Sequence, residues 1–194
     1  MGEGDRGGEP RRTLRARRDA GRAQQAAEPG GDTSVDGSSR QTPLLNAFTV
    51  DVEDYFHVEA FADRISPDTW EQYPSRVVNN TRRVLELFAR ADVRGTFFIL
   101  GWVAERFPHL VREIQAAGHE LGCHSYLHQC VWRLTPEQFR KDTQRAIASI
   151  QDAAGGPVTG YRAPTFSIVE RTLWALEILA EEGLRYDSSV FPVR

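Results

Sequence analysis

The 194-residue sequence lacks a long apolar run, a strong net charge and an apolar leader segment. A membrane-spanning helix needs about 18 consecutive apolar residues, and a secretion signal needs an apolar stretch of about 7 to 15 residues near its start. Neither is found, so we expect no stable membrane insertion and a cytoplasmic location. The formal net charge of −3 supplies no basic field that would attract nucleic acid or anionic lipid, which are therefore not expected partners.

Cysteine is also scarce, because the chain contains only Cys123 and Cys130. Structural zinc sites and dithiol redox sites use closely spaced pairs, and these two residues are too far apart in the sequence to match that pattern. We therefore expect two unpaired thiols, as is usual in a reducing compartment.

Apolar residues are rare over residues 1–44, which are rich in Gly, Arg, Asp, Glu, Ala and Ser. Such a segment cannot bury enough surface to offset the entropy lost on ordering, so we predict a disordered tail. Its arginines are nearly balanced by acidic residues, which argues against a polybasic membrane anchor. Residues 45–194 are long enough for one domain with a hydrophobic core.

From Leu45 onward, short apolar runs alternate with amphipathic stretches. The pattern predicts strands near residues 48, 97, 120, 159 and 185, and helices over 79–91, 103–117, 135–154 and 169–182. Thr135, Pro136 and Gln138 form the pattern of a capped helix start, and Gly118 suits a left-handed helix end. The alternation predicts an α/β fold with a parallel sheet. This sheet is either open or part of a (β/α) barrel, because five strands cannot close such a barrel.

Side chains that ligate metals or titrate follow the predicted strands. The carboxyl ends of parallel strands meet at one edge of a sheet, so these side chains should converge there. His124 and His128 are four residues apart, which places two imidazoles within reach of one ion. A carboxylate from the end of the first strand would be the third ligand and would leave positions for water. This donor set favours a divalent metal, with Zn²⁺ first, that makes hydroxide available near neutral pH.

Four motifs resemble those of the polysaccharide deacetylases with a NodB homology domain, carbohydrate esterase family 4. These motifs are Thr49-Val50-Asp51-Val52-Glu53-Asp54, His124-Ser125-Tyr126-Leu127-His128, Arg162-Ala163-Pro164 and Asp187-Ser188-Ser189. The resemblance covers the chain from about Leu45 to its end. It implies a distorted (β/α) barrel whose C-terminal part is missing here, and a metal-dependent hydrolase that removes acetyl groups from N-acetylated polysaccharides.

The resemblance also implies catalytic roles for these residues. Asp51 would be the base that deprotonates the attacking water, and Arg162 would orient this base and keep it ionised. His124 and His128 would bind the metal together with an acid of the first motif. The attack would be on the acetamide carbonyl, and a general acid would then protonate the departing amine.

The same motifs suggest residues that would contact the sugar. Pro164, Thr165 and Asp187 would lie along the substrate groove, and a backbone N–H near Thr165 would stabilise the oxyanion. Tyr126 lies within the histidine motif and is expected to contact sugar. His57 follows the first motif on a predicted loop, where it would either touch substrate or lie at the surface.

The first motif departs from the family pattern, in which two aspartates are paired. Here the acids are Asp51, Glu53 and Asp54, so the metal carboxylate is either Glu53 or Asp54. In an extended strand Asp51 and Glu53 share one face, whereas a turn that begins at Val52 would bring in Asp54 instead. We favour Asp54.

A second departure concerns the family's fifth motif, a Leu-x-His whose histidine protonates the leaving amine. No histidine follows His128 in this sequence. If the natural chain ended at Arg194, the general acid would be missing, whereas in a truncated sequence it would lie downstream. The stretches FTVDVEDYFHVEAF, residues 48–61, and GTFFILGWVAERFP, residues 95–108, are most similar to a subgroup associated with exosortase and exopolysaccharide loci, which implies an exopolysaccharide substrate. The alternatives are an allantoinase-like hydrolase of small cyclic amides, and an inactive sugar-binding or metal-binding module.

Overall fold

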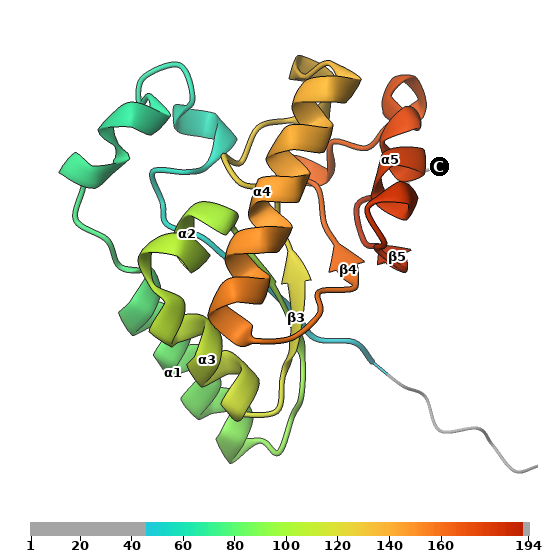
Figure 1. Ribbon diagram of the computed structural model, residues 1–194. Coiled ribbons are helices and arrows are strands. Elements are labelled where there is room, and N and C mark those ends of the chain that lie inside the picture. The colour runs from blue at the N-terminus through green and yellow to red at the C-terminus, as the bar shows by residue number, and fades with distance from the viewer. Residues whose placement is uncertain (1–45, 192–194) are drawn as a thin grey trace, which may run out of the picture. The chain divides into compact units, whose positions relative to one another are not determined.

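The computed structural model describes residues 46–191, and the predicted disordered tail over residues 1–44 lies outside them. Five parallel strands form one sheet in the order β1-β2-β3-β4-β5. Their bounds are Thr49–Val52, Thr96–Ile99, Glu120–Cys123, Gly160–Tyr161 and Tyr186–Asp187. Helices connect successive strands (Figure 1), which confirms the predicted α/β fold with a parallel sheet.

The α-helices of the described residues are α1 (Val77–Arg90), α2 (Gly101–Arg106), α3 (Pro108–Ala116), α4 (Pro136–Ala154) and α5 (Trp174–Glu181). Helix α4 packs against α2, α3 and α5, and it lies in front of β3 in Figure 1. Its start is the predicted capping box, in which Thr135 accepts from the backbone N–H of Gln138 and the Gln138 side chain accepts from the backbone N–H of Thr135. Its end is Gly155 in the left-handed conformation, with φ of 71°.

The single helix predicted over residues 103–117 is wrong, because the structure has two helices there. Phe107 separates α2 from α3 with φ of −126° and ψ of 57°, which are not helical values. Pro108 begins α3, and a proline disfavours helical backbone in the residue before it and offers no N–H to the preceding turn. The predicted left-handed helix end at Gly118 is confirmed, with φ of 81°.

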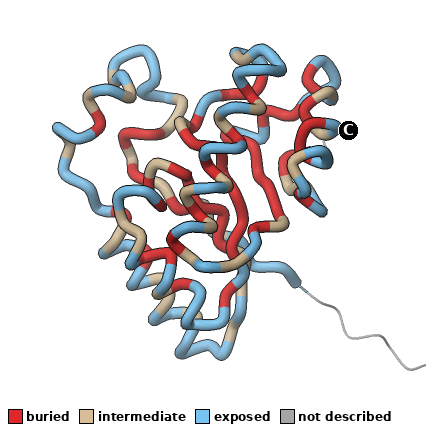
Figure 2. Tube along the Cα trace, viewed as in Figure 1, coloured by how far each residue is buried: buried red, intermediate tan, exposed pale blue. Residues whose placement is uncertain are grey.

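The hydrophobic core lies between the sheet and the helices. Strand β2 and the residue after it are the most buried part, since Phe97, Ile99 and Leu100 have no exposed surface. Leu110 of α3 and Ile150 of α4 are buried as completely. Figure 2 shows the same distribution, with buried backbone through the sheet and exposed residues along the outer sides of the helices. The sheet is therefore a rigid base for the side chains that follow its strands.

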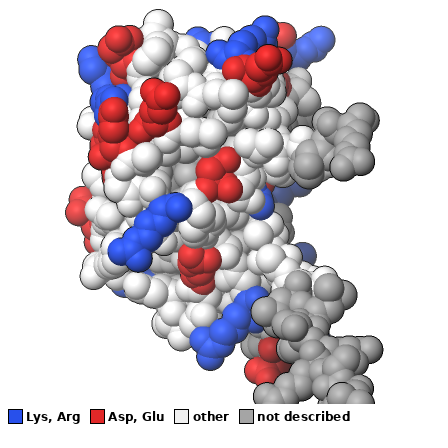
Figure 3. Space-filling model, turned by 90° about the vertical axis from the view of Figure 1, so that its right-hand side faces the viewer, with Lys and Arg blue, Asp and Glu red and all other residues white. Residues whose placement is uncertain are grey.

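The outer surface carries charges of both signs. On the face shown in Figure 3, acidic and basic side chains are interspersed without one continuous patch of either sign. Over residues 46–191, no helix combines the length and the apolar character that crossing a membrane would need.

Candidate metal centre and catalytic pair

The register of the sheet aligns the ends of its strands. Pairing between neighbouring strands forms one row of five residues: Val52, Ile99, Cys123, Tyr161 and Asp187. The residue after this row is Glu53 on β1, His124 on β3 and Arg162 on β4. Three candidate site residues from separate parts of the sequence therefore lie at the carboxyl edge of the sheet.

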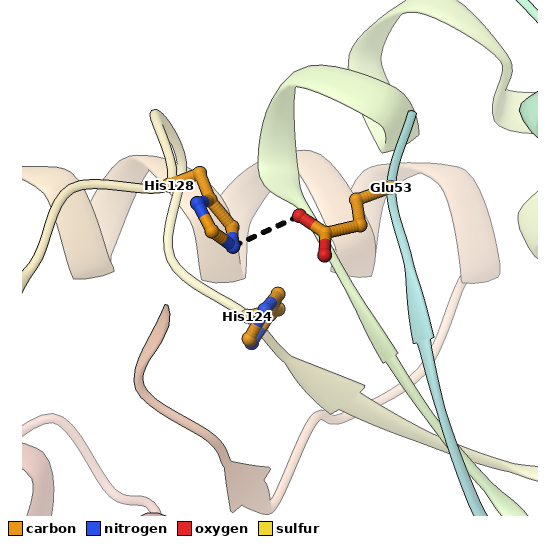
Figure 4. A group of neighbouring side chains, drawn as sticks. All are labelled: Glu53, His124 and His128. Atoms are coloured by element: carbon orange, nitrogen blue, oxygen red, sulfur yellow. Dashed lines mark ion pairs between the residues drawn. The ribbon is translucent and has the colours of Figure 1, made fainter. Parts of the chain in front are cut away.

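Glu53, His124 and His128 form a group of three potential metal ligands, drawn in Figure 4. One ligand atom from each residue lies within 4.8 Å of the other two. Nε2 of His128 is 2.8 Å from Oε2 of Glu53. Nδ1 of His124 is 2.7 Å from the backbone oxygen of Arg162. Because a carbonyl only accepts, this nitrogen carries the proton, and Nε2 of His124 is left with a lone pair for a ligand bond.

The polar atoms of this group fit a bound cation. Nδ1 of His128 is buried without a hydrogen-bond partner in the described part of the chain, and the buried Oε2 of Glu53 lies beside Nε2 of His128 without the geometry of a hydrogen bond. Burial lowers the pKa of His124, although the nearby charge of Asp51 opposes this shift, so its imidazole is neutral near pH 7. Burial acts to raise the pKa of Glu53, but contact with His128 and the nearby imidazoles lowers it below its ordinary value. Neutral imidazole and ionised carboxylate are the forms that bind metal.

Asp54 does not join this group, so the preference for Asp54 is corrected to Glu53. The side chain of Asp54 is buried and accepts hydrogen bonds from Oγ of Ser75 and from the backbone N–H of Arg76, at 2.8 Å in the second case. Arg76 directly precedes α1, so this carboxylate holds the start of that helix. Figure 4 shows the side chain of Glu53 pointing toward His124 and His128.

Asp51 and Arg162 form an ion pair next to the metal group. The strand predicted near residue 48 is β1, Thr49–Val52, so Asp51 lies inside it and does not follow it. Nη1 of Arg162 donates to Oδ1 of Asp51 at 2.9 Å, and Nη2 donates to Oγ of Ser188 at 2.8 Å. The guanidinium lies 4.3 Å from the centre of the Phe98 ring. The Phe98 ring packs directly against Gly122. A side chain at position 122 would place its Cβ atom only 2.4 Å from this ring, so the ring position requires glycine there.

The residues predicted to contact sugar differ in their exposure and in their hydrogen bonds. Thr165 is exposed and has a left-handed backbone with φ of 56°, and Pro164 before it is buried. Asp187 accepts hydrogen bonds from the backbone N–H and the hydroxyl of Ser189. Tyr126 is buried in the core, and its hydroxyl donates to Glu105. The ring has little exposed surface but lines two pockets, so its contact with a sugar stays a prediction.

His57 was expected to touch substrate or to lie at the surface, and the surface placement is wrong because only 4% of His57 is exposed. Its Nδ1 accepts from the backbone N–H of Asp54 at 2.8 Å. Its ring packs against Trp70 and Trp102, with ring centres 4.3 and 5.0 Å away. Burial lowers the pKa of His57 to about 3, with a further contribution from His128. His57 and His128 both line a cavity of about 130 Å³, and no sequence motif indicated this association.

Comparison with known proteins relates this chain to a protein family. Residues 68–186, more than half of the chain, match the family model described as polysaccharide deacetylase. The peptidoglycan deacetylase of Helicobacter pylori is 32% identical over 108 residues, which cover 56% of this chain and 36% of that protein. The peptidoglycan-N-acetylglucosamine deacetylase of Bacillus cereus is 32% identical over 98 residues, which cover 50% of this chain and 36% of that protein. The chain thus spans about a third of the length of these relatives.

Solved structures agree with this assignment. A Mycobacterium smegmatis protein assigned to the polysaccharide deacetylases is 36% identical, with a TM-score of 0.58 over 74% of this chain and 50% of that one. The family 4 carbohydrate esterase from Streptomyces lividans, solved with acetate, is 25% identical, with a TM-score of 0.55 over 72% of this chain and 59% of that one. A family model that matches most of the folded region, together with these structures, shows that the chain belongs to the polysaccharide deacetylase family.

Proposed function

We propose that this chain carries the metal centre and the base of a hydrolase that removes acetyl groups from an N-acetylated polysaccharide. The observation that supports this most directly is the convergence of Glu53, His124 and His128, whose ligand atoms lie within 4.8 Å of one another. The Asp51–Arg162 pair next to this group adds a carboxylate that is held in place. An inactive sugar-binding module would need neither feature, and an inactive metal-binding module would not need the Asp51–Arg162 pair.

Glu53, His124 and His128 would hold a divalent cation, and Zn²⁺ fits the donor set. When bound, such an ion supplies a water of lowered pKa and a Lewis acid for the acetamide oxygen. Asp51 then accepts the proton of the attacking water through one carboxylate oxygen, while its other oxygen is held by Arg162. The exposed, left-handed backbone at Thr165 would direct an N–H toward the developing oxyanion.

The proposed substrate is a polymer of N-acetylated sugars, and a bacterial exopolysaccharide is the more specific proposal. The named relatives from Helicobacter pylori and Bacillus cereus act on peptidoglycan, a polysaccharide that carries N-acetyl groups. The resemblance of residues 48–61 and 95–108 to the exopolysaccharide-associated subgroup supports the narrower choice. Chitin-type oligomers, peptidoglycan and acetylated exopolysaccharide, assayed side by side, would rank these substrates.

Release of acetate from N-acetylglucosamine oligomers tests the proposed activity. We expect acetate only when Zn²⁺ or another divalent metal is present, and loss of activity after treatment with a chelator. His124→Ala should abolish both metal binding and acetate release, because His124 supplies one of three ligand atoms. His109→Ala is the matched control, since His109 is exposed on α3 and lies outside the group. Equal activity with and without chelator would contradict the proposal, as would equal effects of the two variants.

A further inference from the structure

The loop that carries both histidines adopts an unfavourable backbone conformation. Ser125 and His128 have φ of 62° and 53°, in the left-handed region that residues other than glycine rarely occupy. Residues in such conformations persist only when the surrounding structure constrains them. Because this loop sets the spacing between His124 and His128, the groups that constrain it also determine where the two imidazoles lie.

One constraint comes from within the loop and two from α2. Oγ of Ser125 accepts from the backbone N–H of His128 at 3.0 Å. The carbonyl oxygens of Ser125 and Tyr126 accept from the backbone N–H groups of Gly101 and Trp102, at 2.8 and 3.4 Å. These contacts satisfy one N–H and two carbonyls of the loop. They leave the N–H groups of Tyr126 and Leu127 without a partner inside the loop or on α2.

Asp142 of α4 accepts from both remaining N–H groups. Its Oδ2 is 2.7 Å from the backbone nitrogen of Tyr126, and its Oδ1 is 3.1 Å from that of Leu127. Burial raises the pKa of Asp142, whereas the hydrogen bonds from these two N–H groups act to lower it and so favour the ionised carboxylate. The Asp142 carboxylate thus accepts hydrogen bonds from the two peptide groups at the centre of the loop. Asp142 lies on α4, which begins after the loop in the sequence.

We propose that Asp142 is a positioning residue for the metal centre, acting through the backbone of Tyr126 and Leu127 to hold His124 and His128 at the spacing that one ion requires. This inference rests on the proposed function, because it assigns Asp142 a role in metal binding. Helix α4 is held by its own capping box and by packing against α2 and α3, so it offers a fixed support for this carboxylate. Asp142 does not touch the reacting atoms and is not a catalytic residue.

Asp142→Asn tests the proposal with little change in shape. The amide keeps one oxygen acceptor but turns an NH₂ donor toward the second backbone N–H, so one hydrogen bond is lost and two donors oppose each other. We expect the Zn²⁺ affinity, measured by chelator competition, to fall about 10- to 100-fold, the range seen when groups behind metal ligands are changed. We also expect an altered visible absorption spectrum when Co²⁺ is bound. Asp142→Glu keeps the carboxylate and should recover part of the affinity.

The matched control is Asp152→Asn, which removes the same charge at an exposed position of the same helix. It should leave both the affinity and the Co²⁺ spectrum unchanged. If Asp142→Asn lowers the melting temperature but binds Zn²⁺ as tightly as the wild type, with the same Co²⁺ spectrum, the positioning role is refuted. If Asp142→Asn does not fold, the comparison is made with Asp142→Ser, which also removes the carboxylate and for which wild-type affinity and spectrum would be the refuting result. Failure of the wild-type chain to bind any divalent metal would instead refute the proposed function itself.

Discussion

The structure separates two adjacent acids into different roles, and this separation can be measured. Glu53 lies within 2.8 Å of His128 in the ligand group, whereas Asp54 accepts hydrogen bonds at the start of α1. Glu53→Gln should therefore weaken metal binding and barely change the stability of the metal-free protein. Asp54→Asn should destabilise the metal-free protein and leave metal binding unchanged. These two isosteric changes remove the same charge from neighbouring residues, so each is the control for the other.

Their magnitudes follow from the contacts. Loss of a group behind a metal ligand costs about 10- to 100-fold in affinity, so loss of the ligand carboxylate Glu53 should cost at least about 100-fold, or about 2.7 kcal/mol. Asp54 accepts two hydrogen bonds, and bonds to a charged group contribute about 1.5–3 kcal/mol each. The amide oxygen of Asp54→Asn keeps one of them, so we expect the free energy of unfolding to fall by about 1.5–3 kcal/mol.

Two assays distinguish these effects. Urea unfolding of the chelator-treated protein gives the free energy of unfolding, and competition with a chromophoric chelator gives the Zn²⁺ affinity. We expect the Zn²⁺ affinity of Asp54→Asn to remain within about threefold of wild type, because Asp54 lies outside the ligand group. The reverse pattern, with Asp54→Asn losing metal and Glu53→Gln losing stability, would show that the assignment of Glu53 is wrong.

Two further predictions concern the base and the buried histidine. Arg162→Gln should lower the free energy of unfolding by about 2–3 kcal/mol, because it leaves the half-buried Asp51 without its partner. It should also reduce kcat by about 100-fold while the Zn²⁺ affinity is kept. Urea unfolding, acetate release and chelator competition test this, and a parallel loss of metal binding would count against it. The pKa of His57 is about 3 in the folded protein and near 6.5 in the unfolded chain. The metal-free protein should therefore lose stability as the pH falls from about 6.5 toward about 3, by up to about 1.4 kcal/mol per pH unit. His57→Asn keeps an acceptor for the N–H of Asp54 and should flatten that dependence in urea unfolding at pH 7 and pH 5, whereas an unchanged slope would exclude His57 as its source.

The positions of the strands and of most helices were predictable because they depend on local patterns. The capping box at Thr135 and the left-handed glycine at Gly118 involve residues close in sequence, so neighbouring residues alone carry the signal. The break between α2 and α3 was equally local, since it is caused by Pro108, but the apolar pattern of the surrounding helices obscured it. The convergence of His124 with an acid of the first motif followed from the rule that parallel strands end at one edge.

The error at Asp54 and the unforeseen burial of Tyr126 concern contacts between residues far apart in sequence. The choice between Glu53 and Asp54 depended on Ser75 and Arg76, which lie more than 20 residues later in the sequence. Both donate hydrogen bonds to the Asp54 carboxylate. The burial of Tyr126 depends on α2 and on Glu105, and the loop sequence around it contains no sign of either. The alternation of side chains along a strand did indicate Glu53 as the acid that joins the histidines, because it places Asp51 and Glu53 on one face.

Arg162 connects the two halves of the candidate site through different parts of one residue. Its guanidinium donates to Asp51, the proposed base, while its backbone oxygen accepts from Nδ1 of His124 and thereby fixes which nitrogen of that ligand is free. A side-chain substitution removes the first interaction and leaves the second, because every residue at this position has the same carbonyl. Loss of activity without loss of metal in Arg162 variants would therefore reflect the base alone. The position of the carbonyl is set by the pairing of β4 with β3, so the orientation of the proposed ligand His124 depends on the sheet rather than on the arginine side chain.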